Sequence, residues 1–197
     1  MSECRLRILP APAMALVMAH AGATEAASRA AEPAFGVALP TRARLARGGV
    51  ADFVWNGPGR WLALVEPARA EAAGGIEALL EPVFGGVASV TDISGSRVLV
   101  EVSGSGAAEV LAGAVPVDLH PQIFGAGDTA ICRANLVPLQ LWRHGAGEDF
   151  VLALPRSHAG GFVRWLEAQL FSRSWKTSAQ MSTRDRKSTR LNSSHLV

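Results

Sequence analysis

The chain has 197 residues, and 49% of them are hydrophobic, which suits a folded protein with one sizeable core or two small ones and excludes wholesale disorder. Its formal net charge of +2 hides an uneven distribution: residues 1–170 hold 13 Arg against 16 Asp and Glu, and residues 171–197 hold six Lys or Arg against one Asp. The body is mildly acidic, so composition gives no support for nucleic-acid binding.

The N-terminus places Arg5 and Arg7 ahead of the apolar run ILPAPAMALVMA. Two prolines and a length of roughly a dozen residues argue against an export signal, and the run is too short to span a bilayer. We expect a first strand here. The two cysteines, Cys4 and Cys132, have no metal-ligand spacing and no CxxC motif, which indicates reduced, inert thiols in a cytoplasmic protein.

Residues 1–86 are predicted to form an N-terminal α+β subdomain. Its expected elements follow in chain order: a strand over residues 13–20, a helix over 24–31 ending before Pro33, a hairpin over 50–67 that reverses at 56–59, and a helix over 68–84 weakened by Gly74 and Gly75. Trp55 and Trp61 flank the reversal, which favours a core plug or a protein interface, with an aromatic ligand platform as the alternative.

Three arginines, Arg42, Arg44 and Arg47, lie close together before this hairpin. Such a group is typical of a solvated face. The alternative is a basic rim that meets a cofactor phosphate or an acidic partner.

Residues 87–170 are predicted to form a C-terminal α+β subdomain. We expect strands over residues 87–91, 97–102, 129–133, 137–143 and 150–154, and a helix over 106–112 capped by Ser105. A last helix, capped by Ser157, would carry Phe162, Trp165, Leu166 and Leu170 on one face. The whole chain therefore reads as repeated strand and helix units, an α+β fold with mainly antiparallel sheets.

The composition changes after Phe171: ten of the last 27 residues are Ser or Thr, and both Lys residues of the chain fall here. The stretch DRKSTRLNSSH resembles one reading frame of a common sequencing adapter. Residues 171–197 are therefore expected to be a disordered, artefactual tail that takes no part in the fold; a natural basic tail is the alternative.

No dinucleotide, P-loop, zinc-protease or nucleophile-elbow motif is present. Two weak candidates are Asp92 with Ser94, and Asp118 with His120. Asp92 could orient a substrate amine, but a carboxylate that accepts backbone N–H groups in the DISG turn is the commoner case. Asp118 and His120 could do acid–base work, yet without a nucleophile or metal partner a structural turn is favoured.

Three further features give weaker signals. His144 and His158 are expected to face solvent, and residues 103–106 (SGSG) could cradle an anion, although simple helix capping is more usual. The sequence therefore assigns no catalytic, cofactor-binding or metal-binding residue.

Several short motifs nevertheless follow one another in an order that is typical of one protein family. They are FGVALP, WNGPGRWLAL, VTDISGSRVLVEVSG, AAEVLAG, PVDLHP, FGAGD, LWR and SHAGGFVRWLE. From about Phe35 to Leu170 the chain resembles the gamma subunit family of heterotetrameric sarcosine oxidase. DLHP and GPGRWL are the most specific parts of this resemblance. The DIS motif and the SGS helix opening are also similar to the folate-binding fold of the aminomethyltransferases.

The resemblance implies a non-catalytic subunit that assembles with alpha, beta and delta subunits. Such a complex oxidatively demethylates sarcosine to glycine, producing hydrogen peroxide and a one-carbon unit that passes to tetrahydrofolate. In that family FAD, FMN and NAD belong to alpha and beta, and zinc to delta. A stand-alone folate-binding or one-carbon transfer protein is the alternative, which would need Asp92 and either Trp55 or Trp61 in one pocket.

Overall fold

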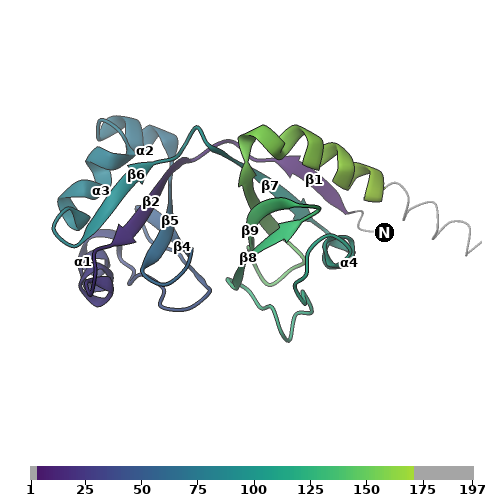
Figure 1. Ribbon diagram of the computed structural model, residues 1–197, viewed down its shortest axis with the longest axis horizontal. Helices are drawn as coiled ribbons and strands as arrows, with labels where there is room; N and C mark the ends of the chain where they lie inside the picture. The colour runs from purple at the N-terminus through teal and green to yellow at the C-terminus, as the bar shows by residue number, and fades with distance from the viewer. Residues whose placement is uncertain (1–3, 171–197) are drawn as a thin grey trace, which may run out of the picture. The chain divides into compact units, whose positions relative to one another are not determined.

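The computed structural model describes residues 4–170, so the predictions for residues 171–197 lie outside the described residues. The chain forms two five-stranded sheets with helices, and every pairing between their strands is antiparallel (Figure 1). The expectation of an α+β fold with mainly antiparallel sheets is confirmed. Both sheets belong to a compact unit that ends at Ala159, and a second unit begins at Gly160.

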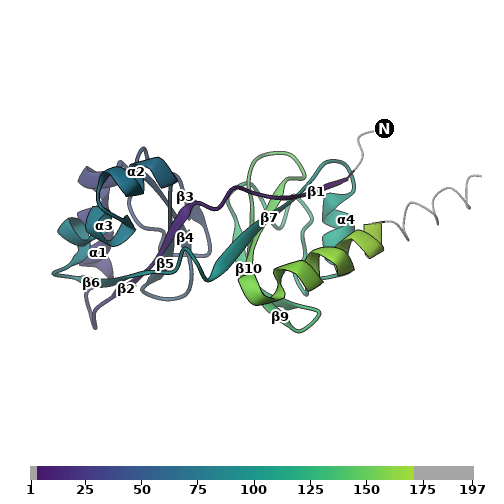
Figure 2. The same ribbon diagram turned by 90° about the horizontal axis from the view of Figure 1, so that it is seen from above.

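The first sheet has the strand order β3-β4-β5-β2-β6. Its strands are β2 (Ala13–Ala19), β3 (Leu45–Ala46), β4 (Ala51–Trp55), β5 (Arg60–Val65) and β6 (Ala88–Asp92). The predicted hairpin is present as β4 and β5, and it places Trp55 opposite Trp61. Three helices accompany this sheet in Figures 1 and 2: α1 (Thr24–Phe35), α2 (Pro67–Ala72) and α3 (Ile76–Phe84).

One core joins this sheet to α1 and α3. Phe35, Phe53 and Phe84 form its aromatic centre, with ring centroids 5.3 to 6.1 Å apart. All three rings are buried, and they are packed with small residues of β2 and β5 such as Ala15 and Ala63. Burial of this apolar surface is the main favourable contribution to the stability of the first sheet and its helices.

Two helix predictions were wrong in their bounds. α1 continues through Pro33 to Phe35 because burial of the Phe35 ring rewards one more turn, and Gly36 then ends the helix in the left-handed region with φ 74°. The helix expected over residues 68–84 is two helices, α2 and α3. Gly74 and Gly75 adopt φ of 86° and 121°, which no helix accommodates.

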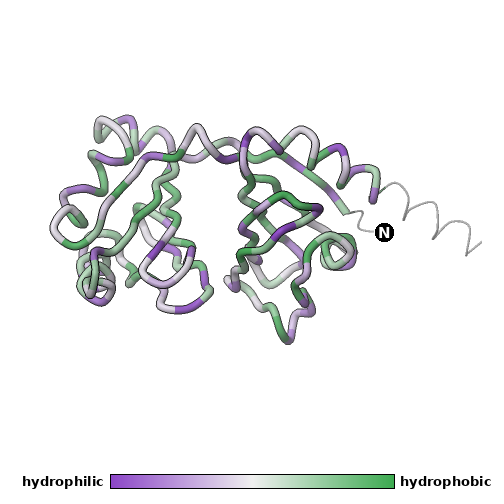
Figure 3. The backbone as a smooth tube through the Cα atoms, viewed as in Figure 1, coloured by the Kyte–Doolittle hydropathy of each residue, from purple (hydrophilic) through white to green (hydrophobic). Residues whose placement is uncertain are grey.

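The second sheet has the strand order β1-β7-β10-β9-β8. Its strands are β1 (Arg5–Ile8), β7 (Arg97–Ser103), β8 (Thr129–Ala134), β9 (Val137–Arg143) and β10 (Phe150–Pro155), and the short helix α4 (Ala107–Ala112) follows β7. Figure 3 shows hydrophobic residues running along the strands of both sheets. Val100 and Val102 are buried on one face of β7, as the alternation predicts, but Leu99 on the other face is buried as well and Val98 is only half-buried.

The apolar N-terminal run is two strands that belong to different sheets. β1 pairs with β7, and β2 pairs with β5 and β6. The division into residues 1–86 and 87–170 stays a prediction. Each sheet takes one edge strand, β1 or β6, from the other side of that division.

Neither predicted serine cap forms. α4 begins after Gly106, whose φ is 87°, and no side chain caps it. The last helix spans residues 156–170, so Ser157 lies inside it. Phe162 and Leu166, two of the four residues predicted to share one face of this helix, are buried, and the Phe162 and Trp165 rings lie 5.6 Å apart. Within residues 4–170, no helix is long and apolar enough to cross a membrane.

Candidate functional site

A pocket of about 450 Å³ lies where α2, Gly74 and Gly75, and the start of α3 meet the entry to β2. Asp92 and Ser94, at the end of β6, contribute to its wall, and Glu71 supplies a second carboxylate. The remaining wall is mainly apolar and includes Ala13 and Ile76. The first predicted candidate pair is therefore brought together and placed at a pocket.

Hydrogen bonds within the chain hold both members of this pair in place. Asp92 Oδ1 accepts the backbone N–H of Ser94 at 2.7 Å and its hydroxyl at 2.6 Å. The Ser94 hydroxyl in turn accepts the N–H of Met14 at 2.9 Å. These bonds fasten the DISG turn to β2, which confirms the expectation that Asp92 accepts a backbone N–H group. Within residues 4–170, the hydrogen-bond partners of Ser94 are Asp92 and the backbone of Met14, and no histidine is among them.

The pocket lacks the aromatic wall that the folate alternative requires. None of its lining residues is aromatic. Trp61 is 1% exposed in the core of the first sheet, where its Nε1 donates to the carbonyl of Pro40 at 2.8 Å. The prediction of a core plug is confirmed for Trp61. Neither Trp61 nor Trp55 lines this pocket beside Asp92.

Asp118 and His120 form a turn. Asp118 Oδ1 accepts the N–H of His120 at 3.0 Å, and His120 Nδ1 accepts the N–H of Gln122 at 3.3 Å. Leu119 between them is buried and anchors the loop. Each side chain is bonded to the backbone of this loop, as expected for a structural turn. Among residues 4–170, no group of three or more His, Cys, Asp or Glu side chains could hold a metal ion.

At residues 103–106, where the sequence allowed an anion-binding loop, an acidic side chain of the same chain forms a hydrogen bond to the backbone. The Gly106 N–H donates to Glu148 Oε2 at 2.9 Å. His144 and His158 are exposed, as predicted. Sequence patterns did not predict the hydrogen bond between Gly106 and Glu148, because these two residues are 42 positions apart.

The three arginines divide into two kinds. Arg44 forms an ion pair with Asp128 at 2.7 Å and donates to the Ala126 carbonyl at 2.7 Å, and Arg47 donates to the His144 carbonyl at 2.6 Å. Arg42 is exposed. Arg44 and Arg47 therefore tie the loop before β4 to the loops that flank β8 and β9, a structural role that neither prediction included.

A smaller hollow of about 180 Å³ lies beside β4, with Asp52, Glu66 and Arg69 in its wall. Burial raises the pKa of Asp52, against the lowering effects of the Gly48 N–H and of the Arg47 and His144 charges. Arg69 donates to the Gly49 carbonyl at 2.8 Å. Asp52 Oδ1 accepts the backbone N–H of Gly48 at 3.2 Å, so this carboxyl has a structural role in the loop before β4.

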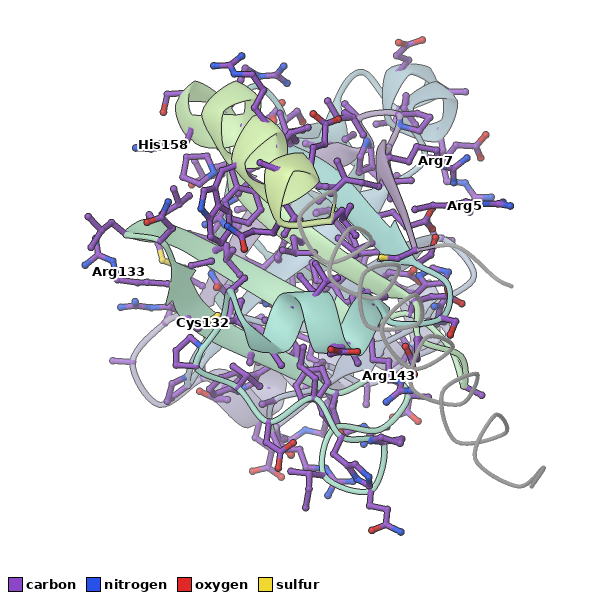
Figure 4. The ribbon with its side chains drawn as sticks, turned by 90° about the vertical axis from the view of Figure 1, so that its right-hand side faces the viewer. Arg5, Arg7, Cys132, Arg133, Arg143 and His158 are labelled. Atoms are coloured by element: carbon purple, nitrogen blue, oxygen red, sulfur yellow. The ribbon has the colours of Figure 1, made fainter. Side chains whose placement is uncertain are left out.

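Arg143 is the one charged side chain among the buried polar residues of the described chain, at 3% exposed. Its guanidinium donates to the carbonyls of Gly147 and Phe124, both at 2.9 Å, and lies 5.4 Å from the centre of the Phe150 ring (Figure 4). These contacts replace water around the charge and fix the turn between β9 and β10. Sequence reasoning placed Arg143 only at a strand end.

The two cysteines are free thiols, in agreement with the prediction. Burial raises the pKa of both, and the nearby Glu148 carboxylate adds to the effect at Cys4. A raised thiol pKa lowers the fraction of reactive thiolate, so neither cysteine has the surroundings of a nucleophile.

A family model described as the sarcosine oxidase gamma subunit family matches residues 19–171. The chain belongs to this family. Curated relatives agree with the assignment. The chain is 35% identical to the sarcosine oxidase subunit gamma of Corynebacterium sp. strain P-1 over 136 residues, which cover 68% of this chain and 64% of that protein. It is 33% identical to the corresponding subunit of Corynebacterium sp. strain U-96, over 74% of this chain and 68% of the relative. The matched stretch thus spans just under two thirds of the strain P-1 protein.

Solved structures confirm the predicted fold relationship. A chain of the heterotetrameric sarcosine oxidase from Corynebacterium sp. U-96, determined with pyrrole 2-carboxylate, superposes with a TM-score of 0.71 at 27% identity, covering 86% of this chain and 84% of that one. The aminomethyltransferase T of the glycine cleavage system of Bartonella henselae superposes with a TM-score of 0.58 at 19% identity, covering 87% and 46%. The second likeness concerns the fold alone.

Proposed function

We propose that this chain is the non-catalytic gamma subunit of a heterotetrameric sarcosine oxidase. The observation that carries the proposal is the superposition on a chain of such an enzyme over 86% of this chain and 84% of the other. In the proposed complex, alpha, beta and delta subunits accompany this chain in the cytoplasm. The complex demethylates sarcosine oxidatively, releases glycine and hydrogen peroxide, and passes the one-carbon unit to tetrahydrofolate.

We assign no catalytic, cofactor-binding or metal-binding residue to this chain. The hydrogen bonds of the candidate residues support this part of the proposal: Asp92, Ser94, Asp118 and His120 all bond to the backbone of their own loops or of β2. FAD, FMN, NAD, tetrahydrofolate and zinc are assigned to the partner subunits. The role of this chain is then to pack against the others and stabilise the assembly.

The test is co-expression of the full chain with the other three subunits of the same oxidase, with the affinity tag on a partner. We expect stable co-purification and sarcosine-dependent peroxide production, and loss of a stable active complex when this chain is omitted. Asp92→Asn should leave peroxide production unchanged, because the proposal gives Asp92 no catalytic role. A chain that stays monomeric beside its partners would contradict the proposal.

The folate-binding alternative makes a different prediction for the isolated chain. It requires saturable binding of tetrahydrofolate, measured by isothermal titration calorimetry, that Asp92→Asn weakens. The absence of an aromatic residue from the wall around Asp92 gives this alternative no support.

A further inference from the structure

We propose that the exposed tip and open edge of the β8–β9 hairpin form the surface on which a partner subunit docks. The hairpin patch consists of Ile131, Arg133, Leu136 and Pro138. The inference rests on the proposed function and deepens it by naming the surface and the chemistry of its occupant: an extended segment of a partner subunit that carries apolar side chains and at least one carboxylate.

The first observation is the conformation of Leu136. β8 ends at Ala134 and β9 begins at Val137, so Asn135 and Leu136 alone make the reversal, with φ of 45° and 70°. Such a turn favours Asn followed by Gly, and a branched apolar side chain at its second position is strained. Leu136 is also 84% exposed, so no packing within the described chain offsets the strain. A side chain that is unfavourable in the free subunit is explained by a contact with another molecule.

The second observation is that the hairpin exposes a further large apolar side chain, Ile131, near the turn. Ile131 is 52% exposed, and Arg133 and Pro138 face each other across the two strands on the same face as Ile131. Two large apolar side chains therefore stand in solvent within one hairpin, on a chain with only four such exposed residues in its described part. Contiguous exposed apolar surface marks interaction sites, whereas apolar side chains scattered singly over a surface are normal.

The third observation concerns the backbone of β8, which is an edge strand of its sheet. The loop before β4 covers the start of this edge, where the Thr129 N–H donates to the Ala43 carbonyl at 3.1 Å. Because outward N–H groups alternate along a strand, those of Ile131 and Arg133 also point away from β9. No backbone hydrogen bond from either group occurs within residues 4–170. A segment added to this edge would pair with them.

The charge of Arg133 indicates which kind of partner segment would bind to the hairpin patch. Within the described residues, Arg133 forms no ion pair or hydrogen bond, and Figure 4 shows its side chain projecting outward from β8. An unpaired cation beside two exposed apolar side chains fits a partner segment that combines apolar residues with a carboxylate. A second copy of this chain would bring two arginines together, which disfavours self-association through the patch.

The experiment uses the full chain co-expressed with the other three subunits, and measures how much of each variant co-purifies with a tagged partner. Leu136→Gly relieves the turn strain and removes the apolar anchor. The thermal midpoint of the isolated chain should stay the same or rise, while recovery with the partners falls at least tenfold. A purely structural role for Leu136 predicts no loss of recovery. Arg133→Glu should reduce recovery to a similar degree with the thermal midpoint unchanged.

Matched controls come from the same chain. Ile123→Ser removes another exposed apolar side chain, 67% exposed, outside the hairpin, and Arg42→Glu makes the same charge change on an exposed arginine elsewhere. Both should assemble as wild type does. Normal recovery of Leu136→Gly and Arg133→Glu beside an assembling wild type would overturn the docking surface and leave the proposed function intact. Failure of the wild type to assemble would overturn both. Dimerisation of the isolated chain that Leu136→Gly abolishes would show a second copy as the occupant and overturn the inference.

Discussion

At the scale of single residues, polar groups that look like a site in the sequence hold the backbone in place. Asp92 and Asp118 each accept an N–H group two residues ahead, and the Ser94 hydroxyl bridges to β2. Such short-range bonds follow from residue type and spacing, which is why sequence reasoning favoured them. Arg44, Arg143 and Glu148 bond to groups distant in the sequence or in a separate loop, and local patterns carry no trace of such contacts.

Asp52 provides a pH-dependent prediction at this scale. Because burial raises its pKa in the folded chain, the folded state holds the proton more tightly than the unfolded state, whose pKa is about 3.9. Stability from this group is therefore fully present below about pH 4 and is lost as pH rises through the folded pKa. Asp52→Asn removes the titration and keeps an oxygen for the Gly48 N–H. Relative to wild type, the variant should gain stability as pH rises from 4 to 7.

Urea unfolding of wild type and Asp52→Asn at pH intervals measures this difference directly. The gap between the two unfolding free energies should shift in favour of the variant above pH 4 and then level off. A gap that stays constant with pH would show that the Gly48 N–H and the Arg47 and His144 charges cancel the effect of burial, and a gap that moves in favour of the wild type would show that they outweigh it.

At the scale of elements, the sequence predicted whether most segments form a helix or a strand, but it did not predict where the helices end. Alternation at Val98, Val100 and Val102 predicted β7, and the Asn-Gly-Pro-Gly reversal predicted the β4–β5 hairpin. The predicted end of a helix was wrong where packing in the core determines it. α1 continues past Pro33 because the Phe35 side chain is then buried in the core. The pairing of β1 with β7 joins residues almost a hundred positions apart, which periodicity does not report.

The α2–α3 junction tests the reason for the broken helix. Gly75 has φ of 121°, a region that L-residues rarely adopt, and an added Cβ there would meet no atom within 4 Å. Gly75→Ala should therefore destabilise the chain through backbone strain alone, by about 1–3 kcal/mol. Gly86→Ala is the matched control, since it also meets open space but has no positive φ. It should be neutral or stabilise by up to about 1 kcal/mol. Equal effects in denaturant titrations would rule out strain as the cause.

At the scale of the whole molecule, the chain passes twice between its sheets. It runs from β1 into β2 and later from β6 into β7, so each sheet takes one edge strand, β1 or β6, from the other side of the predicted division at residue 86. A buried cluster is also shared: Met14 and Leu62 of the first sheet pack in one group with Leu99 and Trp142 of the second. Gln140 adds a hydrogen bond to the Trp55 carbonyl at 2.7 Å. These links predict that both sheets unfold together.

Met14→Ala tests this coupling. Met14 is fully buried in the shared cluster, so its truncation should cost about 2–5 kcal/mol of unfolding free energy. Met18→Ala makes the same change on the same strand at a half-buried position and should cost less. In both variants, unfolding followed by far-ultraviolet circular dichroism and by tryptophan fluorescence should give coincident transitions, because Trp61 and Trp142 report on different sheets. Two separate transitions in Met14→Ala would show that the cluster contributes stability without making the sheets cooperative.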